Sequence, residues 1–218
     1  GTTALIYACA LGHADIAEAI LDAGANVELC DARGYNAVHC SALWSRFGHL
    51  AKTNRDERQW IQQNEADLAI AREHTLRLIP TFGPRQLANS ALGVAHCGFE
   101  TIPTWSLLWS RIASASIVCV RDLNSQELTN LVWACATARV TSPRLFDALA
   151  NEVLERMDSL TPLAVSMLAW SFATARHDHQ DVLSGLAFAA SQRVQEMDSA
   201  DLARTAWALG RVHVGDEA

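Results

Sequence analysis

The side chains that could carry out chemistry in this sequence lie in two short clusters. Residues 177–179 read His-Asp-His and could bind a metal ion, but neighbouring loop residues rarely converge on one ion, so a polar loop is the better interpretation. His39 and Cys40 could act as base and nucleophile, but adjacent residues on a helix do not face each other. No phosphate-binding loop, GxSxG motif or HExxH motif is present. We therefore expect no catalytic residue, no metal and no cofactor, and we do not expect an enzyme.

Contact with phosphate groups is a second chemistry that the residue spacing allows. Arg139 and Arg176 are 37 residues apart, and His213 follows after the same interval. At the ends of repeated helices, these side chains would form a row of phosphate contacts. The alternative is that they are cations that stabilise helix C-termini through the helix dipole, by roughly 0.3–1 kcal/mol each.

One further position changes its residue from copy to copy. Asn89, Asn130, Met167 and Arg204 occupy it in turn. Variation at one position of a repeat can encode base specificity, as in helical repeats that read RNA one base per repeat. It is also typical of an exposed position under no constraint. The candidate RNA-contacting residues are Arg139, Arg176, Asn130 and Arg204.

The elements that would position these side chains form a repeat of 37 residues. Its clearest markers are Trp133, Trp170 and Trp207. Residues that favour helix N-caps recur at the same interval, namely Asn124, Thr161 and Asp198. An interval of 41 leads back to an earlier copy, which begins at Gly83-Pro84. Each copy contains apolar helical stretches, so the sequence predicts an α-solenoid of helical hairpins, with about 3.5 repeats over residues 82–218.

The tryptophans and the alanines around them are expected to form the interior of this solenoid. Alanines such as Ala134 and Ala173 allow close approach of the helices, and a tryptophan would fill the remaining volume. Burial of a large apolar side chain contributes about 2–3 kcal/mol. We therefore expect Trp170→Ala to damage the array more than any surface substitution, and we expect recognition at the varied polar positions between the tryptophans.

Residues 1–43 carry a different period. The segment that begins Gly-Thr-Thr-Ala-Leu at residue 1 returns as Gly-Tyr-Asn-Ala-Val at residue 34, an interval of 33. This length and these residues resemble the ankyrin repeat. The resemblance implies a structural role for His39 and a protein partner bound at the ankyrin surface. One repeat cannot bury its own apolar face, so either further repeats lie upstream of Gly1 or this repeat packs on the helical segment that follows. We favour the first, because the chain begins at a repeat boundary.

Residues 44–81 are expected to be a helical linker between these two parts. The stretch 51–60 is polar and charged, and the pattern over 61–79 favours one helix that Pro80 ends. The predicted organisation is therefore entirely α-helical: an ankyrin repeat at 1–43, a linker at 44–81 and a hairpin solenoid at 82–218.

The repeated phrases LANSALGVA, LTNLVWACATAR and LARTAWALG are similar to octotricopeptide repeats and to FAST leucine-rich-type helical repeats. The similarity covers about residues 82–214. Proteins of those families act mainly in the RNA metabolism of mitochondria and plastids. The resemblance therefore implies a factor for RNA processing or stability that binds single-stranded RNA in one of these organelles.

Composition favours a different partner. The chain has 218 residues, is 50% hydrophobic and has a formal charge of −7. Residues 82–218 contain ten arginines and fourteen acidic residues, whereas nucleic-acid-binding proteins usually show a basic face. Six cysteines without a CxxC pair favour a reducing, intracellular compartment, and the longest apolar run, 112–120, is too short to span a membrane. The alternative to RNA binding is thus a pure protein–protein interaction scaffold.

Overall fold

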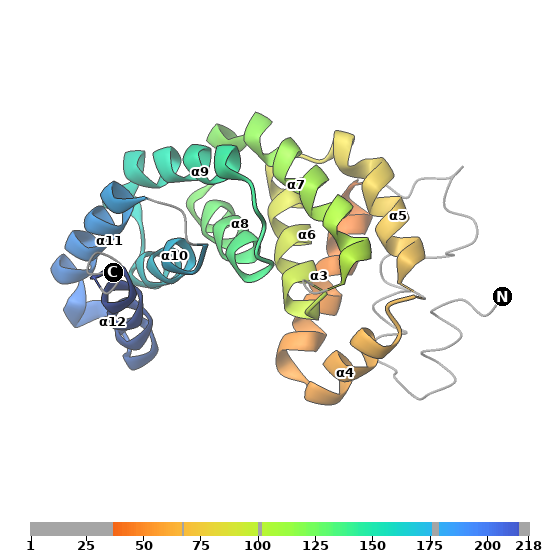
Figure 1. Cartoon of the computed structure of the whole chain (residues 1–218), viewed down its shortest axis with the longest axis horizontal. Helices are drawn as coiled ribbons and strands as arrows, with labels where there is room; N and C mark the ends of the chain where they lie inside the picture. Colours follow the sequence, from red (N-terminus) through yellow and green to blue (C-terminus); the bar gives the residue numbers. More distant parts are fainter. Residues whose placement is uncertain (1–36, 67, 100–101, 176–178, 214–218) are drawn as a thin grey trace.

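The computed structural model describes residues 37–66, 68–99, 102–175 and 179–213 (Figure 1). These residues form α-helices, short 3₁₀ turns and connections, and no β-strand occurs among them. The predicted all-α repeat fold is confirmed. Only residues 37–43 of the expected ankyrin module are described, and Arg176 lies outside the described residues.

The described helices form two layers. The inner layer consists of α3 (Ala37–Thr53), α6 (Pro84–Cys97), α8 (Ser125–Thr137), α10 (Pro162–Ala175) and α12 (Ser199–His213), each packed against the next. The outer layer consists of α5 (Ala69–Leu78), α7 (Ser106–Val118), α9 (Pro143–Glu155) and α11 (Gln180–Gln192). The short helix α4 (Arg55–Gln63) connects the first inner helix to the first outer one. Figure 1 shows the layers curving as an arch, with the outer helices along its convex side.

The starts of the inner helices follow the predicted N-cap signals. Asn124 and Glu127 form a reciprocal capping box at the start of α8. The Thr161 hydroxyl accepts a hydrogen bond from the backbone N–H of Ala164 (3.2 Å), and the Asp198 carboxylate accepts one from Asp201 (2.7 Å). These bonds satisfy backbone N–H groups that have no partner inside the helix. The 37-residue period therefore fixes where each inner helix begins.

A 3₁₀ turn follows each described outer helix and leads into the next inner helix. These turns are Ile79–Thr81, Val120–Asp122, Met157–Ser159 and Val194–Glu196, and a further one, Pro103–Trp105, precedes α7. Two arginines that are 37 residues apart stabilise these turns by hydrogen bonds to backbone carbonyl oxygens. Arg156 donates to the carbonyl oxygens of Leu123 and Arg121, and Arg193 donates to that of Asp158 (2.9 Å). Both arginines are structural, because each ties one repeat to the preceding one.

The closest helix contact lies between α3 and α6. A Cβ on Gly48 would lie 2.6 Å from the Cα of Gly93, and a Cβ on Gly93 would overlap the carbonyl oxygen of Trp44. The two backbones therefore touch directly. The positions that correspond to Gly93 in the later inner helices are also small and buried, namely Ala134, Ser171 and Ala208.

The boundary predicted after residue 43 falls inside α3. The ankyrin pattern ends there, but Leu43, Trp44 and Phe47 continue one buried helix face, at the spacing that lets a helix pack against a neighbour. That neighbour is α6. With the start of α3, residues 44–81 thus form the first hairpin of the array, with α4 inserted, so the predicted helical linker is helical and packs as part of the array.

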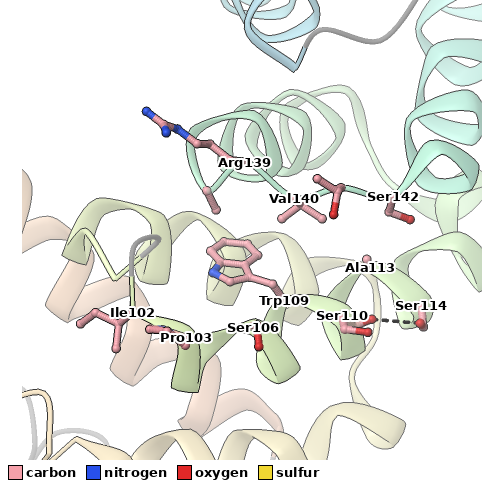
Figure 2. Close-up of a pocket in the computed structure, with 12 residues that line it drawn as sticks. Ile102, Pro103, Ser106, Trp109, Ser110, Ala113, Ser114, Arg139, Val140 and Ser142 are labelled. Carbon is pink, nitrogen blue, oxygen red and sulfur yellow. Dashed lines mark hydrogen bonds between the residues drawn. The ribbon is translucent and has the colours of Figure 1, made fainter.

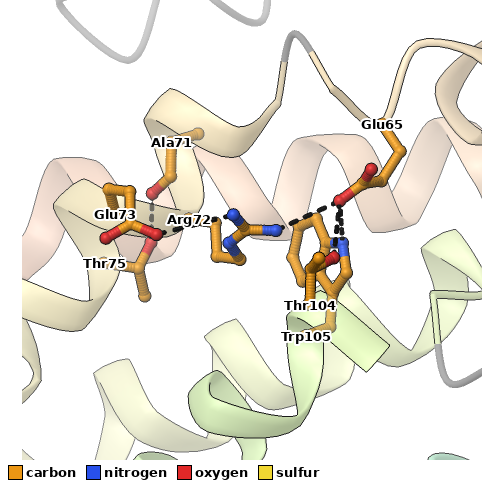
Figure 3. A network of polar contacts seen from close by, with 7 residues as sticks. All are labelled: Glu65, Ala71, Arg72, Glu73, Thr75, Thr104 and Trp105. Atoms are coloured by element: carbon orange, nitrogen blue, oxygen red, sulfur yellow. Dashed lines mark hydrogen bonds and ion pairs between the residues drawn. The ribbon is translucent and has the colours of Figure 1, made fainter. Parts of the chain in front are cut away.

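The single helix predicted over 61–79 is also wrong, because α4 ends at Gln63 and α5 begins at Ala69. Glu65 lies in the break, and Figure 3 shows why the chain leaves the helix there. Its Oε1 accepts hydrogen bonds from Trp105 Nε1 (2.6 Å), Thr104 (3.1 Å) and Arg72 (3.1 Å). The guanidinium carbon of Arg72 also lies 5.6 Å from the Trp105 ring centroid. Contacts with residues about 40 positions away outweigh local helix propensity at Glu65.

The stretch 51–60, whose polar and charged residues favour a solvated linker or an exposed helix face, is mostly exposed and includes the first turns of α4. The side chain of Asn54 caps α4 by accepting from the backbone N–H groups of Asp56 and Glu57. Trp60 is buried. The charged residues of this stretch therefore cover a short helix that contributes to the core.

Candidate functional site

The inner surface of the arch is formed by one stripe of side chains on each inner helix. On α8 the stripe consists of Gln126, Asn130, Trp133 and Thr137, which share one helix face at intervals of four, three and four residues. All four side chains are partly or fully exposed, whereas most residues between them are buried. The same stripe recurs on α10 and α12 at intervals of 37. The repeat therefore presents equivalent positions side by side along the concave surface.

Trp133, Trp170 and Trp207 form an aromatic ladder across this surface. The ring centroids of the first pair are 6.4 Å apart and those of the second pair are 6.3 Å apart. His96 of α6 extends the ladder, with its ring centroid 4.6 Å from that of Trp133. These separations are those of aromatic rings in direct contact. The ladder spans four successive inner helices.

The prediction that the tryptophans fill the solenoid interior is wrong. Trp133 and Trp170 are only partly buried, and Trp207 is 45% exposed. The interior is instead filled by aliphatic residues and phenylalanine, such as Leu131, Val132, Leu168 and Phe172. The reason is helical phase: Trp133 stands next to Val132, about 100° around the helix from the buried face. The tryptophans therefore belong to the surface of the arch.

The imidazole of His96 is uncharged at neutral pH. Burial, together with the charges of Lys52 and Arg58, lowers the pKa of His96 from 6.5 to about 4. A neutral ring can pack against Trp133 without bringing a charge into the contact. His96, the first member of the ladder, is therefore an uncharged aromatic ring.

The varied position lies one helical turn before the ladder. Asn130 and Met167 are partly buried there, as is Arg204. Arg204 donates to the carboxylate of Asp201 (2.6 Å), which also accepts from the hydroxyl of Ser166 on the neighbouring helix (2.7 Å). The structure thus brings two of the predicted residues, Asn130 and Arg204, onto one surface. It engages Arg204 in an ion pair with Asp201 within α12, and the hydrogen bond from Ser166 to Asp201 links this helix to α10.

Arg139 directly follows α8 and has an unusual backbone conformation. Its φ is +53°, in the left-handed region. The preceding repeat has Gly98 at the equivalent position, 41 residues earlier, with φ +81°. The backbone N–H of Val140 closes the helix end by bonding to the carbonyl of Cys135 (2.9 Å), as is common at left-handed caps. A non-glycine residue in this conformation costs about 1 kcal/mol. The sequence therefore has an arginine where glycine would be less strained.

Two arginines line one pocket at the C-terminal ends of the inner helices. Arg139 after α8 and Arg211 of α12 both line it, with Thr174 of α10 between them, and its volume is about 360 Å³. The guanidinium carbon of Arg211 lies 5.3 Å from the ring centroid of Trp207, a cation–π contact. The pocket thus adjoins the end of the ladder. We call it the two-arginine pocket.

A second pocket of about 330 Å³ lies on the other side of the connection between α8 and α9 (Figure 2). It is lined by one face of α7, including Trp109 and Ser110, and by residues 138–142. The Nε1 of Trp109 is buried without a hydrogen-bond acceptor. Figure 2 shows the side chain of Arg139 directed away from this pocket. The charge of Arg139 is therefore presented on the opposite side of the connection.

The residues considered for catalysis and metal binding have ordinary structural surroundings where they are described. Burial raises the pKa of the Cys40 thiol to about 11, so the thiol is protonated at neutral pH. His179 lies 4.0 Å from Asp147, while residues 177 and 178 are outside the described residues. Within the described residues no three His, Cys, Asp or Glu side chains are grouped as metal ligands. In the same part of the chain, no helix is both long and apolar enough to cross a membrane.

Sequence reasoning did not identify His96 and Arg211 as surface residues. Both occupy the last position of the stripe, where α8 and α10 have Thr137 and Thr174. The spacing of four residues between Trp207 and Arg211 predicts a contact on one helix face, so this signal was available. His96 can be recognised as the equivalent of Thr137 only through the interval of 41 residues between the first two copies.

Fold and surface together define a helical repeat protein with an exposed concave surface. The family model of the ankyrin repeat matches residues 1–32. This match supports the ankyrin assignment of that segment and indicates a protein-interaction module there. No curated protein matches the chain.

Proposed function

We propose that the inner surface of the arch binds single-stranded RNA, and that the protein is a binding factor without catalytic activity. The observation that carries this proposal is the ladder, which places one aromatic side chain per repeat beside one polar or varied side chain. Stacking of a base on an aromatic side chain contributes about 1–3 kcal/mol and tolerates any sequence. Of the neighbouring residues, Asn130 and Arg204 can then distinguish bases by hydrogen bonding, whereas Met167 offers apolar contact.

The distribution of charge supports this proposal more than the total charge does. Among the described residues of α6, α8, α10 and α12, the acidic side chains are Glu127 and Asp201, and both lie in the first turn of a helix. At the opposite edge Lys52, Arg139 and Arg211 are exposed. A strand that crossed the ladder would meet positive charge along that edge. Such an edge can contact a phosphate backbone even in a protein of net negative charge.

The resemblance of residues 82–214 to repeats of organellar RNA factors supports the same ligand. It also leads us to propose that the protein acts in a mitochondrion or plastid, in the processing or stability of transcripts. Imaging of the full-length protein fused to a fluorescent protein tests this part. Diffuse cytosolic fluorescence would exclude the organellar role without bearing on RNA binding.

A protein scaffold without RNA binding is the second candidate. The ankyrin match over residues 1–32 and the formal charge of −7 favour it. On this alternative the inner surface holds a protein segment, and the tryptophans supply apolar contact area. The two candidates predict opposite responses to salt, because neutralised phosphates make RNA binding strongly salt-dependent.

The test is a binding measurement with random-sequence single-stranded RNA at several salt concentrations. We expect binding at low salt that weakens steeply as salt is added. Trp170→Ala should reduce affinity about 5- to 100-fold, the equivalent of one lost stacking contact. The matched control is Phe188→Ala, which removes an aromatic ring that is 68% exposed on the outer helix α11 and should leave affinity unchanged. Absence of binding at low salt, or equal losses in both variants, would contradict the proposal.

A further inference from the structure

We propose that Arg139 and Arg211 together bind one phosphate group of the RNA backbone in the two-arginine pocket. This inference rests on the proposed function, and it identifies a backbone phosphate as the part of the RNA that the two-arginine pocket binds. The phosphate would lie over the C-terminal end of α10 and would join the ends of α8 and α12. One contact would thus span two repeat intervals.

The first support is the choice of residue at position 139. The equivalent position in the preceding repeat is Gly98, and both residues have a positive φ. Glycine adopts this conformation freely, whereas arginine does not. The arginine at this strained position therefore supplies a positively charged side chain, which glycine lacks. This side chain is exposed and has no carboxylate partner among the described residues.

The second support is the orientation of Arg211. Its guanidinium group is held over the ring of Trp207, and it too has no carboxylate partner within the described part of the chain. A cation–π contact leaves the guanidinium N–H groups free to donate in the plane of the group. Planar guanidinium groups bind phosphate through pairs of parallel hydrogen bonds. Two such groups on one pocket supply enough donors for the oxygens of a phosphate.

The third support is a hydroxyl group inside the pocket. Thr174 lines it between the two arginines, and its Oγ1 is buried with no hydrogen-bond partner. A buried polar atom without a partner is destabilising, and a rotation of the Thr174 side chain about χ1 would turn this hydroxyl toward a ligand oxygen in the pocket. Hydroxyl and guanidinium donors together suit an anion with several acceptor oxygens.

A purely structural role for these arginines makes a different prediction. Cations near helix C-termini stabilise helices through the dipole, which also disfavours an anion at the same place. If the dipole were the reason for Arg139, Arg139→Gly would lower the melting temperature. If phosphate binding is the reason, Arg139→Gly relieves strain, so the melting temperature stays the same or rises while affinity for RNA falls.

The experiment compares the whole chain with Arg139→Gly, Arg211→Gln and the double variant. Affinity for random-sequence single-stranded RNA is measured over a range of salt concentrations, with Arg111→Gln on the outer helix α7 as the control. We expect each single variant to lower affinity and to reduce the slope of log affinity against log salt by about 0.7. The double variant should lose little more than either single variant, because both side chains bind the same phosphate.

The outcomes separate this inference from the proposed function. RNA binding with the same affinity and slope in all variants would overturn the two-arginine site and leave RNA binding intact. Thermal stabilisation of the unaltered chain by inorganic phosphate, lost in Arg139→Gly, without RNA binding would support a phosphate site and overturn RNA as its source. Losses that add fully in the double variant would overturn a single shared phosphate.

Discussion

The junction between α3 and α6 and the regular array of α8, α10 and α12 solve the same packing problem in different ways. At the junction two glycines let backbones touch, and the corresponding buried positions of the array are Ala134, Ser171 and Ala208. At the junction Trp44 is fully buried, and its Nε1 donates to the hydroxyl of Thr75 (2.7 Å). The array instead carries its repeated tryptophans on the surface, where they form the ladder.

This difference indicates a division of labour between the two regions. Equal intervals of 37 residues bring the same position of each repeat into line, and only such a register can place three tryptophans in successive contact. The junction departs from this interval and has no tryptophan in the ladder. Its contacts are specific to single residues, which is suitable for a fixed end of the array. The array instead presents equivalent positions of successive repeats side by side.

The largest expected effect comes from Gly93→Ala at the junction. The new methyl group would overlap the carbonyl oxygen of Trp44, a backbone atom that cannot turn away, so α3 and α6 would have to separate. We expect a loss of more than about 3 kcal/mol in the free energy of unfolding, measured by urea denaturation.

Two controls test whether this effect is particular to the junction. Ser171→Ala changes the equivalent position in α10, and Gly210→Ala adds a methyl group where nothing lies within 4 Å. We expect Ser171→Ala to change stability by less than about 1 kcal/mol and Gly210→Ala to stabilise by roughly 0.5–1 kcal/mol. Equal destabilisation by Gly93→Ala and Ser171→Ala would remove the distinction between the regions.

The second prediction concerns the array and compares two residues of α10. Leu168 is fully buried, whereas Trp170 is partly exposed on the ladder. Leu168→Ala should cost about 3 kcal/mol of unfolding free energy, because it leaves a cavity. Trp170→Ala should cost about 1–2 kcal/mol, from lost ring contacts and partial burial. Thermal and urea unfolding of both variants measures these two losses of free energy. A larger loss in Trp170→Ala than in Leu168→Ala would support the interpretation that the tryptophan is a core residue.

The angular position of the tryptophans on their helices shows what could be predicted from the sequence. Leu128, Leu131, Val132 and Cys135 share one helix face and are all buried. Trp133 does not share it, so the same apolar periodicity that predicted the helix also predicts an indole outside the interior. Apolar character alone favoured the opposite interpretation. The exposure of the tryptophans was therefore predictable from the sequence, but only from their angular position relative to the buried helix face.

Other features depend on contacts that a single sequence does not reveal. The break between α4 and α5 depends on the contact of Glu65 with Trp105. Asn64 is a local signal of a helix end there, but it does not reveal this contact. The presence of Arg139 and Arg211 on one pocket depends on the packing of α8 and α12 on either side of α10. Caps and helix order were predictable because they are local. These long-range contacts were not.

The third prediction tests the polar contacts of the junction through Glu65→Ala. This change leaves the indole N–H of Trp105, a residue buried at 0% exposure, without its acceptor, and it removes the ion pair with Arg72. We expect a loss of about 2 kcal/mol in unfolding free energy. Glu65→Gln keeps a carbonyl oxygen and should lose about half as much. Glu155→Ala, at an exposed position of α9, should change stability by less than about 0.5 kcal/mol, and a similar loss there would contradict a specific role for Glu65.

The smallest expected effect concerns His96, where the two regions meet. Lys52 and Arg58 of the junction act with burial to lower its pKa to about 4, while its ring contacts Trp133 of the array. In the unfolded chain a histidine has a pKa of about 6.5. Between these two values the unfolded chain binds a proton that the folded protein does not, so stability falls as the pH is lowered from about 6.5 to about 4.

This pH dependence can be measured by urea denaturation at a series of pH values in parallel with His96→Phe. The phenylalanine keeps a ring against Trp133 and removes the titrating group. We expect the difference in unfolding free energy between the two proteins to change by about 1 kcal/mol over this window, because solvent screens part of the shift at a partly buried ring. A constant difference would mean that the pKa of His96 is not lowered in the folded protein. A change of the expected sign would show that burial, with the charges of Lys52 and Arg58 beside it, keeps the first ring of the ladder neutral.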